Sequence, residues 1–541
     1  MRVGIIADRC EAATSGERLD IARALALAGH EVVVFGLGPW PTGSGPRTVE
    51  TVVDTVNHYS DAVPGLDLGL THSQALYERL ASEHRARPFD VVDMPLVPPV
   101  GLVAAERFRG PVVVALDGRA RRATAGAEPG LEGRLLARSH DTYETGAGAE
   151  AALAAYQRAS AAWQARCAES RVSPSVIQVA ESLAPTNAVS SIIGRHAGVI
   201  ADLGLDPTVY THLAPSGRVP SNLRAHECLA QPEAGVILHY WGYSHTAWLL
   251  WAIEGRRALY YHGITPPDYF ATGSATWREN VRGLRQLSEL ADEFDLVIGD
   301  SDYNVAEVVA RRGRPVRALT IYPPVDIAEL RSALVDQPLL ARLRQDTVRN
   351  VLFVGRLARN KRQDQVMRAF DAHQAQGGAK ARLWLVGSGE ADPAYRAELE
   401  ALRQELPSGG RIMFTGVVPA AALMAYYRAA DVFVCASEHE GFCIPIAEAM
   451  AFGVPVIALA AAAVPETMGG GGTLLEIWAT EAVAATMEQY LTDGDLRAQT
   501  LVRQEENVSR FSARSAAEGF RAAVQFLGDG RESPLIQWWS T

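Results

Sequence analysis

Two acidic residues flank a Gly-Phe-Cys tripeptide in the stretch SEHEGFCIPIAEAMAFGVPVIA, and their spacing suits a polar ligand. The apolar run DVFVCAS before it is typical of a buried strand, so Glu440 falls in the loop at that strand's carboxyl end. Open parallel sheets bind ligands at this edge. Pro445 is typical of the first residue of a helix, which places Glu448 in the first helical turn. The two acids could therefore face one ligand, one from the loop and one from the helix.

The residues between the two acids predict an anion-binding helix start. Gly441 would let the backbone approach a ligand closely. The amides of Phe442, Cys443 and Ile444 would point outward at the helix N-terminus. A diphosphate at this point, with hydroxyl-rich groups on either side, would satisfy the arrangement. Glu448 taken alone could equally complement the helix dipole, and only its spacing from the loop acid favours the ligand.

Two cations follow another predicted strand in the segment FVGRLARNKRQD. Arg356 and Lys361 come just beyond the apolar run VLFV. Cations at a strand end that faces an anion-binding helix start would stabilise the negative charge of a leaving diphosphate. Surface Arg and Lys are usually solvated, so these two cations alone would be weak evidence for a binding site. The predicted anion-binding helix start near Glu440 strengthens that interpretation.

The elements that would position these residues follow a repeating α/β pattern. MRVGIIAD, an amphipathic helix that stops at Gly29, and a β-branched run at 31–35 predict a strand, a helix and a strand. Residues 175–212 repeat this pattern, and 89–118 can be laid beside 234–263, which indicates a duplicated half. A third α/β series begins near Val351.

The composition is that of an ordinary globular chain. Of 541 residues, 48% are hydrophobic and 21% are charged, and the length predicts several domains. The formal net charge of -11 argues against a nucleic-acid surface. Five cysteines, far apart and without CxxC spacing, support neither a disulfide framework nor a zinc site. No apolar run approaches the roughly 20 residues of a membrane span, so we expect a cytoplasmic protein, with peripheral membrane contact left open.

Several motifs in order resemble the donor half of glycosyltransferase family 4, which has the GT-B fold. They are FVGRLARNKRQDQVMRAF, LWLVGSGE, the stretch from FTGVV to GVPVIA, and AAAVPETMGGGG. YYHGITPPDYF, DLVIGDSDYN and IYPPVD look like the acceptor half of the same family. The resemblance covers roughly residues 175–530.

The resemblance implies an α/β chain with two facing Rossmann-like domains, to which this sequence adds a further N-terminal α/β domain. We expect the following organisation: an N-terminal Rossmann-like domain that is a degenerate duplicate of an acceptor half (1–150), a helical linker (151–174), an acceptor-side domain (175–340), a nucleotide-sugar donor domain (341–530) and a C-terminal tail (531–541).

The resemblance also implies roles for individual residues. Glu440 would hold sugar hydroxyls, Glu448 the ribose, and Arg356 and Lys361 the diphosphate, while His262 looks like the family's cleft histidine beside the reacting sugar. Further donor-binding positions would be the main chain at Gly416, Val417 and Val418 beside the base, and Gly387, Ser388, Gly389 and Glu390 near the nucleotide. No metal and no cofactor is implied beyond the donor itself.

This sequence departs from the family pattern at several points. Cys443 stands where many relatives have Gly, and we interpret it as a small, partly buried residue whose amide does the work. Gly263 follows His262 where close relatives usually carry Asn. The DSD sequence at 300–302 formally matches a metal clasp of another glycosyltransferase fold, but between a strand and a helix it favours an N-cap role. In the N-terminal copy, Asp117 and Gly118 stand where the second copy has His262 and Gly263.

The resemblance implies a retaining glycosyltransferase that moves a sugar from a nucleotide-sugar donor to an acceptor hydroxyl without a metal ion, and the absence of an obvious enzymic nucleophile suggests a front-face mechanism. A GT-B nucleotide-sugar epimerase and a non-catalytic nucleotide-sugar-binding scaffold are the alternatives. The acceptor, which could be a saccharide, a lipid-linked molecule or a small molecule, is left open, as are the donor's base and sugar and the oligomeric state.

Overall fold

The computed structural model describes residues 255–345 and 347–540 without a break. Before residue 255 it describes the segments 2–9, 31–37, 47–51, 91–95, 112–116, 141–144, 151–155, 157–159, 175–183, 188–211, 222–224 and 234–244, with single positions at 22, 24, 26, 28, 246, 247, 250 and 253. The chain divides into two compact units, of which the second comprises Ser173–Cys228, Ala234–Thr246 and Gly255–Thr541.

The first unit contains one parallel sheet with the strand order β3-β2-β1-β4-β5-β6 in its described residues. Its strands are β1 (Arg2–Arg9), β2 (Glu31–Leu37), β3 (Arg47–Thr51), β4 (Val91–Pro95), β5 (Val112–Leu116) and β6 (Asp141–Glu144). Asp117 and Gly118 lie outside the described residues. The duplicated N-terminal domain therefore stays a prediction. Of the expected linker helix, residues 151–155 and 157–159 are described and helical.

The second unit begins with a sheet whose strands run parallel except at one edge, in the order β20-β13-β12-β11-β10-β7-β8-β9. It lies in the predicted acceptor domain, and we call it the acceptor-side sheet. The strands are β7 (Val176–Ala180), β8 (Val209–Thr211), β9 (Asn222–Arg224), β10 (Gly235–Tyr240), β11 (Arg257–Tyr261), β12 (Leu296–Gly299) and β13 (Val316–Thr320). The helical segments are α8 (Ala188–Asp202), η4 (Pro267–Tyr269), α9 (Ala275–Leu290), η5 (Ala291–Glu293) and α10 (Asp302–Val309). Its central strands are buried along their whole length, as expected of a parallel sheet covered on both faces.

A second parallel sheet, with the order β16-β15-β14-β17-β18-β19, lies in the predicted donor domain, and we call this part of the second unit the donor side. Its strands are β14 (Arg349–Val354), β15 (Ala381–Val386), β16 (Ile412–Gly416), β17 (Val432–Cys435), β18 (Val456–Leu459) and β19 (Gly472–Leu475). Its longer helices are α13 (Gln363–Ala375), α14 (Pro393–Glu405), α15 (Ala420–Ala429), α16 (Ile444–Ala451), α18 (Thr480–Thr492) and α19 (Gly494–Val508). Shorter segments are α11 (Ile327–Ser332), α12 (Gln337–Arg344), η6 (Arg359–Lys361), η7 (Gly409–Arg411), α17 (Val464–Met468) and η8 (Ser509–Phe511).

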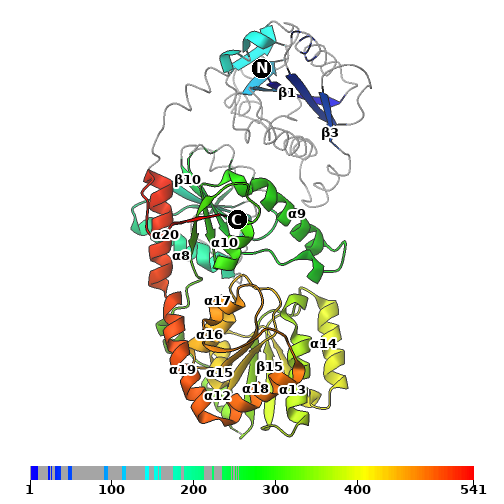
Figure 1. Ribbon diagram of the computed structural model, residues 1–541, viewed down its shortest axis with the longest axis vertical. Coiled ribbons are helices and arrows are strands. Elements are labelled where there is room, and N and C mark those ends of the chain that lie inside the picture. The colour runs from blue at the N-terminus through cyan, green and yellow to red at the C-terminus, as the bar shows by residue number, and fades with distance from the viewer. Residues whose placement is uncertain are drawn as a thin grey trace. The chain divides into compact units, whose positions relative to one another are not determined.

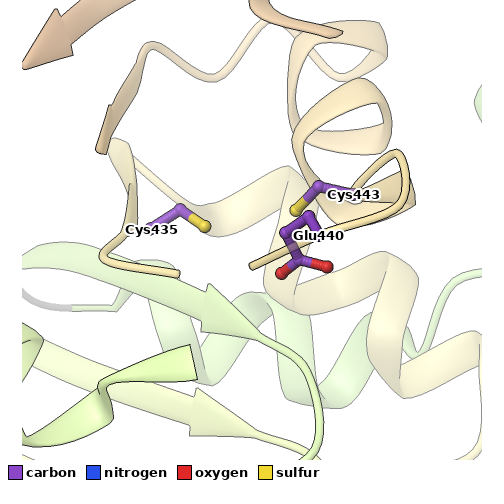
Figure 2. A group of neighbouring side chains, drawn as sticks. All are labelled: Cys435, Glu440 and Cys443. Atoms are coloured by element: carbon purple, nitrogen blue, oxygen red, sulfur yellow. The ribbon is translucent and has the colours of Figure 1, made fainter. Parts of the chain in front are cut away.

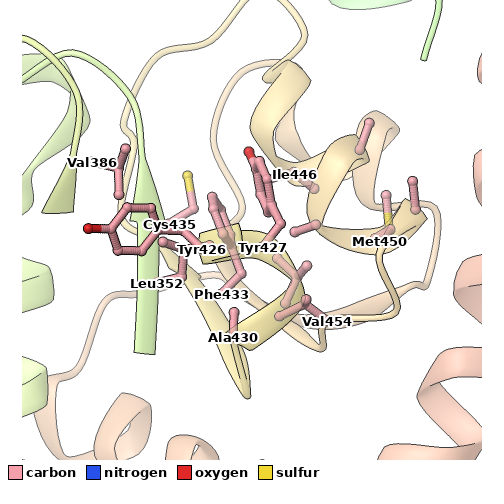
Figure 3. Close-up of a cluster of buried hydrophobic side chains, with 14 of the residues drawn as sticks. Leu352, Val386, Tyr426, Tyr427, Ala430, Phe433, Cys435, Ile446, Met450 and Val454 are labelled. Carbon is pink, nitrogen blue, oxygen red and sulfur yellow. The ribbon is translucent and has the colours of Figure 1, made fainter. Parts of the chain in front are cut away.

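Hydrophobic layers cover both faces of the donor-side sheet. One buried cluster joins α12, α15 and α16 to the sheet, and Figure 3 shows Tyr426, Tyr427, Phe433 and Ile446 within it. The other cluster joins α13, α14 and α18 to the opposite face. α12 contacts α15, so the donor side begins slightly before the predicted boundary at 340/341. None of the helices in the described part of the chain is both long and apolar enough to span a bilayer.

The last helix returns to the acceptor-side sheet. α20 (Ala513–Asp529), which we expected to end the donor domain, contacts α8 and β10 instead, because its apolar face is buried there (Figure 1). The ring of Phe520 lies 3.8 Å from that of His196, centroid to centroid. A Cβ at Gly235 would lie 2.9 Å from the Cβ of Leu527, so β10 needs glycine for this close approach.

The tail continues the same sheet. β20 (Gln537–Trp539) pairs antiparallel with β13, so part of the predicted C-terminal tail forms an edge strand of this sheet. Trp538 is 65% exposed and stacks with the guanidinium of Arg317, so backbone pairing and this contact hold the tail rather than burial of the indole.

Replacing Phe520 tests how far α20 stabilises the acceptor side. We expect Phe520→Ala to lower the free energy of unfolding by about 3–5 kcal/mol, because the ring is fully buried and its removal leaves a cavity. Urea denaturation of the full chain, followed by tryptophan fluorescence, measures the loss. Arg514→Ala on the exposed face of α20 is the control, and equal effects of the two changes would contradict this account.

Candidate functional site

The acidic loop holds a buried ion pair at the end of β17. Glu440 is 8% exposed, and the Nζ of Lys361 lies 2.5 Å from its Oε1. Lys361 ends η6, just after β14, so the pair joins two loops at the carboxyl ends of neighbouring strands. Burial alone would lower the pKa of Lys361, but the Glu440 carboxylate outweighs it and the pKa is raised. Lys361 therefore stays charged at neutral pH, which suits the binding of an anionic ligand.

The loop approaches the acceptor-side domain so closely that Gly441 leaves no room for a side chain. A Cβ at this position would lie 2.8 Å from the carbonyl oxygen of His262. We expected Gly441 to allow the close approach of a ligand. In the structure it allows the close approach of the His262 backbone. The Oγ of Ser301 also donates a hydrogen bond of 2.7 Å to the carbonyl of Gly441.

The helix that follows begins one residue earlier than expected. Cys443 is the N-cap with a left-handed backbone (φ 72°), and Ile444 and Pro445 are the first two helical residues. Glu448 consequently lies beyond the first turn of α16. The first turn itself contains no acidic residue. The prediction that Glu448 lies in the first turn was therefore wrong. Because the effect of the helix dipole falls off within that turn, the dipole explains the presence of Glu448 less well than a ligand contact does.

Glu448 is nevertheless held in a defined position. The hydroxyl of Tyr427 on α15 donates a hydrogen bond of 2.7 Å to its Oε2. Burial raises the pKa of Glu448, and the Tyr427 hydroxyl partly offsets this. The carboxylate thus has one fixed partner and a second oxygen that remains available as an acceptor.

The glycine-rich segments of the predicted donor site meet at three adjacent strand ends. A Cβ at Gly387 would lie 2.0 Å from the carbonyl oxygen of Gly355, and the amide of Gly387 donates to the carbonyl of Gly416. The amide of Leu357 donates to the carbonyl of Ser388. The side chains of Arg356, Glu390 and Val417 are exposed around these segments, and Ser388, Gly389 and Val418 are partly buried.

His262 points its imidazole into the acceptor-side domain. Its Nδ1 lies 2.9 Å from Oδ2 of Asp300, and its Nε2 lies 3.0 Å from Nδ1 of His239. The Nε2 of His239 in turn lies 2.9 Å from Oε1 of Gln178. Burial, and to a lesser extent His262, lowers the pKa of His239 well below its usual range, so this ring is neutral. With its side chain 1% exposed, His262 presents its main-chain carbonyl, not its ring, to the acidic loop.

Sequence analysis missed Gln178, His239 and Asp300 as partners of His262. The signal was present, because Gln178 and His239 are polar residues inside the apolar strands VIQVA and GVILHY. Such residues need buried partners. In the DSD sequence, Ser301 caps α10 by accepting a hydrogen bond from the amide of Asn304, as the N-cap prediction required.

A further contact joins the two sides of the second unit at α10. The carboxylate of Glu466, in α17, accepts hydrogen bonds of 2.8 and 2.9 Å from the amide of Asp302. It thereby adds a partner for the first amide of α10, while Ser301 caps the amide of Asn304. Burial raises the pKa of Glu466, and the Asp302 amide partly offsets this.

Comparisons with known proteins agree with this architecture. Residues 341–529 match the family model described as Glycosyl transferases group 1. The D-inositol 3-phosphate glycosyltransferase of Corynebacterium jeikeium (strain K411) is 26% identical over 53% of this chain and 71% of its own length. The O-antigen chain mannosyltransferase B of Escherichia coli is 26% identical over 48% of this chain and 67% of its own.

Solved structures show the same fold. The crystal structure of Anabaena HepE in complex with UDP-glucose aligns with 65% of this chain and all of its own, with a TM-score of 0.52 and 18% identity. A glycosyltransferase from Rickettsia africae ESF-5 aligns with a TM-score of 0.51 and 13% identity. The second unit thus has GT-B architecture. The chain is a glycosyltransferase.

Replacing each aspartate of the DSD sequence separately by asparagine tests whether Asp300 positions His262 for the reaction. We expect Asp300→Asn to lower kcat/KM roughly 10- to 100-fold, because a buried hydrogen bond to a charged group contributes about 1.5–3 kcal/mol. Donor affinity should stay unchanged, since Asp300 acts through His262. Release of nucleoside diphosphate, from transfer or from slow donor hydrolysis, measures the rate. The exposed Asp302→Asn is the matched control, and an equal loss in both variants would contradict this role.

Proposed function

We propose that transfer proceeds with retention of configuration, without a metal ion, and with Glu440 and Lys361 at its centre. The buried ion pair of 2.5 Å between these two residues, beside the carbonyl of His262, carries the proposal. It supplies a fixed carboxylate for sugar hydroxyls and a fixed cation for the diphosphate. In a site that excludes water, such preorganised charges stabilise a transition state more than the same groups would in solvent.

The reaction would follow a front-face course. The bond between the anomeric carbon and the phosphate oxygen breaks, and a bond to the acceptor oxygen forms on the same face of the sugar. The departing phosphate oxygen takes the proton of the acceptor hydroxyl. Lys361 and the exposed Arg356 would neutralise the diphosphate, so the protein's contribution is positioning and charge stabilisation.

The remaining donor contacts follow the geometry of the strand ends. Glu448 would bind the ribose with the oxygen that Tyr427 leaves available. The amides after Gly441, namely Phe442, Cys443 and Ile444, would face the diphosphate, and the segments 387–390 and 416–418 would enclose the nucleotide. The meeting of Gly355, Gly387 and Gly416 supports a shared binding surface for these segments.

We extend the proposal to the organisation of the chain. Residues 175–340 would supply the acceptor side, 341–530 most of the donor side, and 1–150 a degenerate acceptor half for acceptor binding or assembly. The similar proteins differ in their named reactions, one acting on D-inositol 3-phosphate and one on an O-antigen chain. A hydroxyl-bearing acceptor is common to both, and we propose no narrower class.

Removing the charge of Glu440 tests its role. We expect Glu440→Gln to lower kcat by about 100- to 1,000-fold, the range for loss of a preorganised electrostatic group. The variant should also lose up to about 3–5 kcal/mol of unfolding free energy, because Lys361 is left as an uncompensated buried charge, so turnover is compared in protein that circular dichroism shows to be folded. Turnover is measured as release of nucleoside diphosphate. Glu438→Gln, in the same loop but paired with Arg362, is the matched control. Near-normal turnover of Glu440→Gln would refute the assignment.

A thermal-shift panel of UDP-, GDP-, dTDP- and ADP-sugars tests the donor site. A donor at about 100 times its dissociation constant stabilises the folded chain by roughly 2.7 kcal/mol, which raises the melting temperature. We expect one base to be preferred and its effect to vanish in Glu448→Ala but not in the exposed Glu476→Ala. Full stabilisation of Glu448→Ala would exclude the ribose contact. Donor binding without turnover would favour the scaffold alternative.

A further inference from the structure

We infer that Cys435, Glu440 and Cys443 form a binding site for a thiophilic divalent cation of the Zn²⁺ class, and that a bound cation inhibits transfer. All three side chains are buried, and their ligand atoms lie within 4.8 Å of one another. Figure 2 shows the three side chains gathered where β17 ends and α16 begins. The inhibitory part of this inference rests on the proposed role of Glu440.

The fold brings the three ligands together although the sequence spacing gives no metal motif. Cys435 is the last residue of β17, and Glu440 and Cys443 belong to the loop that returns beside that strand end. Zinc binds thiolate at about 2.3 Å and carboxylate at about 2.0–2.2 Å, so ligands of one tetrahedral ion lie roughly 3.5–3.8 Å apart. Small side-chain rotations would bring atoms within 4.8 Å of one another to this spacing.

The charges around the cluster balance when a cation binds. Two thiols, one carboxylate and the ammonium of Lys361 carry no net charge, since the acid and the base compensate. Binding of Zn²⁺ with loss of two thiol protons leaves the total at zero: two thiolates and the cation cancel. Because the burial of an uncompensated charge is costly, a neutral product makes a buried site feasible. The other oxygen of Glu440 can ligate the cation while Oε1 keeps Lys361.

Packing alone does not account for this grouping. Buried cysteines usually behave as small hydrophobic residues, and both thiols do contact the cluster shown in Figure 3. A carboxylate among them is different, because its desolvation is costly and its oxygens attract cations. Ser437, whose Oγ lies 3.3 Å from the Sγ of Cys435, adds a hydroxyl beside the cluster, and water could complete the tetrahedron.

A cation on Glu440 would compete with the donor. A carboxylate oxygen bound to a metal no longer accepts hydrogen bonds freely from sugar hydroxyls. The cation would thus lower donor affinity or turnover, and a chelator would restore them. The inference concerns inhibition, and transfer itself stays independent of metal in our proposal.

Cation binding is tested without reference to activity. In a full-length background with Cys10, Cys167 and Cys228 changed to Ser, Cd²⁺ is added to the reduced protein. We expect a thiolate-to-metal absorption band that saturates at one ion per chain, with release of two protons. Cys435→Ser and Cys443→Ser in that background should each lose the band, and Glu440→Gln should weaken binding at least 10-fold. No band in folded background protein, or an unchanged band in either serine variant, would overturn the inference.

Inhibition is tested separately with Zn²⁺ and the native cysteines. We expect micromolar Zn²⁺ to lower donor turnover at least 10-fold, and EDTA to restore it. Cys435→Ser, which leaves the proposed catalytic groups in place, should keep its turnover and resist Zn²⁺.

Inhibition that persists in Cys435→Ser would overturn the regulatory role even if Cd²⁺ binds. Disulfide formation in place of metal binding, seen as loss of free thiols that dithiothreitol but not EDTA reverses, would also overturn it. A failure of Glu440→Gln to affect turnover would refute the proposed function while leaving the Cd²⁺ result intact.

Discussion

The ion pair between Lys361 and Glu440 is the interaction on which the geometry of the donor side depends. Their side chains are 18% and 9% exposed, so each charge has lost most of its water. Removing one partner of such a pair leaves an uncompensated buried charge, which typically costs about 3–5 kcal/mol. The pair therefore fixes two loops against each other, and it does so where β14 and β17 lie side by side.

The strand order explains how residues 79 positions apart come to form that pair. Because β17 adds to the sheet next to β14, with β15 and β16 on the other side, the loops after β14 and β17 share one edge. The acceptor-side sheet uses the same principle. β10, β11 and β12 are neighbours, and His239, His262 and Asp300 come from the ends of these three strands, so they can form one hydrogen-bonded chain.

Sequence could predict the features that depend on local pattern. Apolar runs located the strands, and the polar loop after DVFVCAS located Glu440, because both follow from one continuous segment. Contacts between segments were not predictable in this way. An amphipathic pattern makes α20 a helix but does not say which sheet it covers, and one residue's shift in the start of α16 moved Glu448 out of the first turn. The cysteine pair was dismissed from its spacing, which says nothing about a strand end folding back beside its loop.

At Cys443, the strain of a left-handed backbone is set against the burial of the side chain. Its φ of 72° is the region that glycine adopts freely and other residues adopt at a cost of about 1–2 kcal/mol. This sequence accepts that cost at the N-cap of α16. The side chain is 7% exposed and contacts the core cluster, so burial offsets part of the strain. A glycine would relieve the strain but lose that packing and a thiol beside Glu440. In our proposals, the loop's backbone would bind the diphosphate at the start of α16, while its side chains would determine which cations can approach the carboxylate of Glu440.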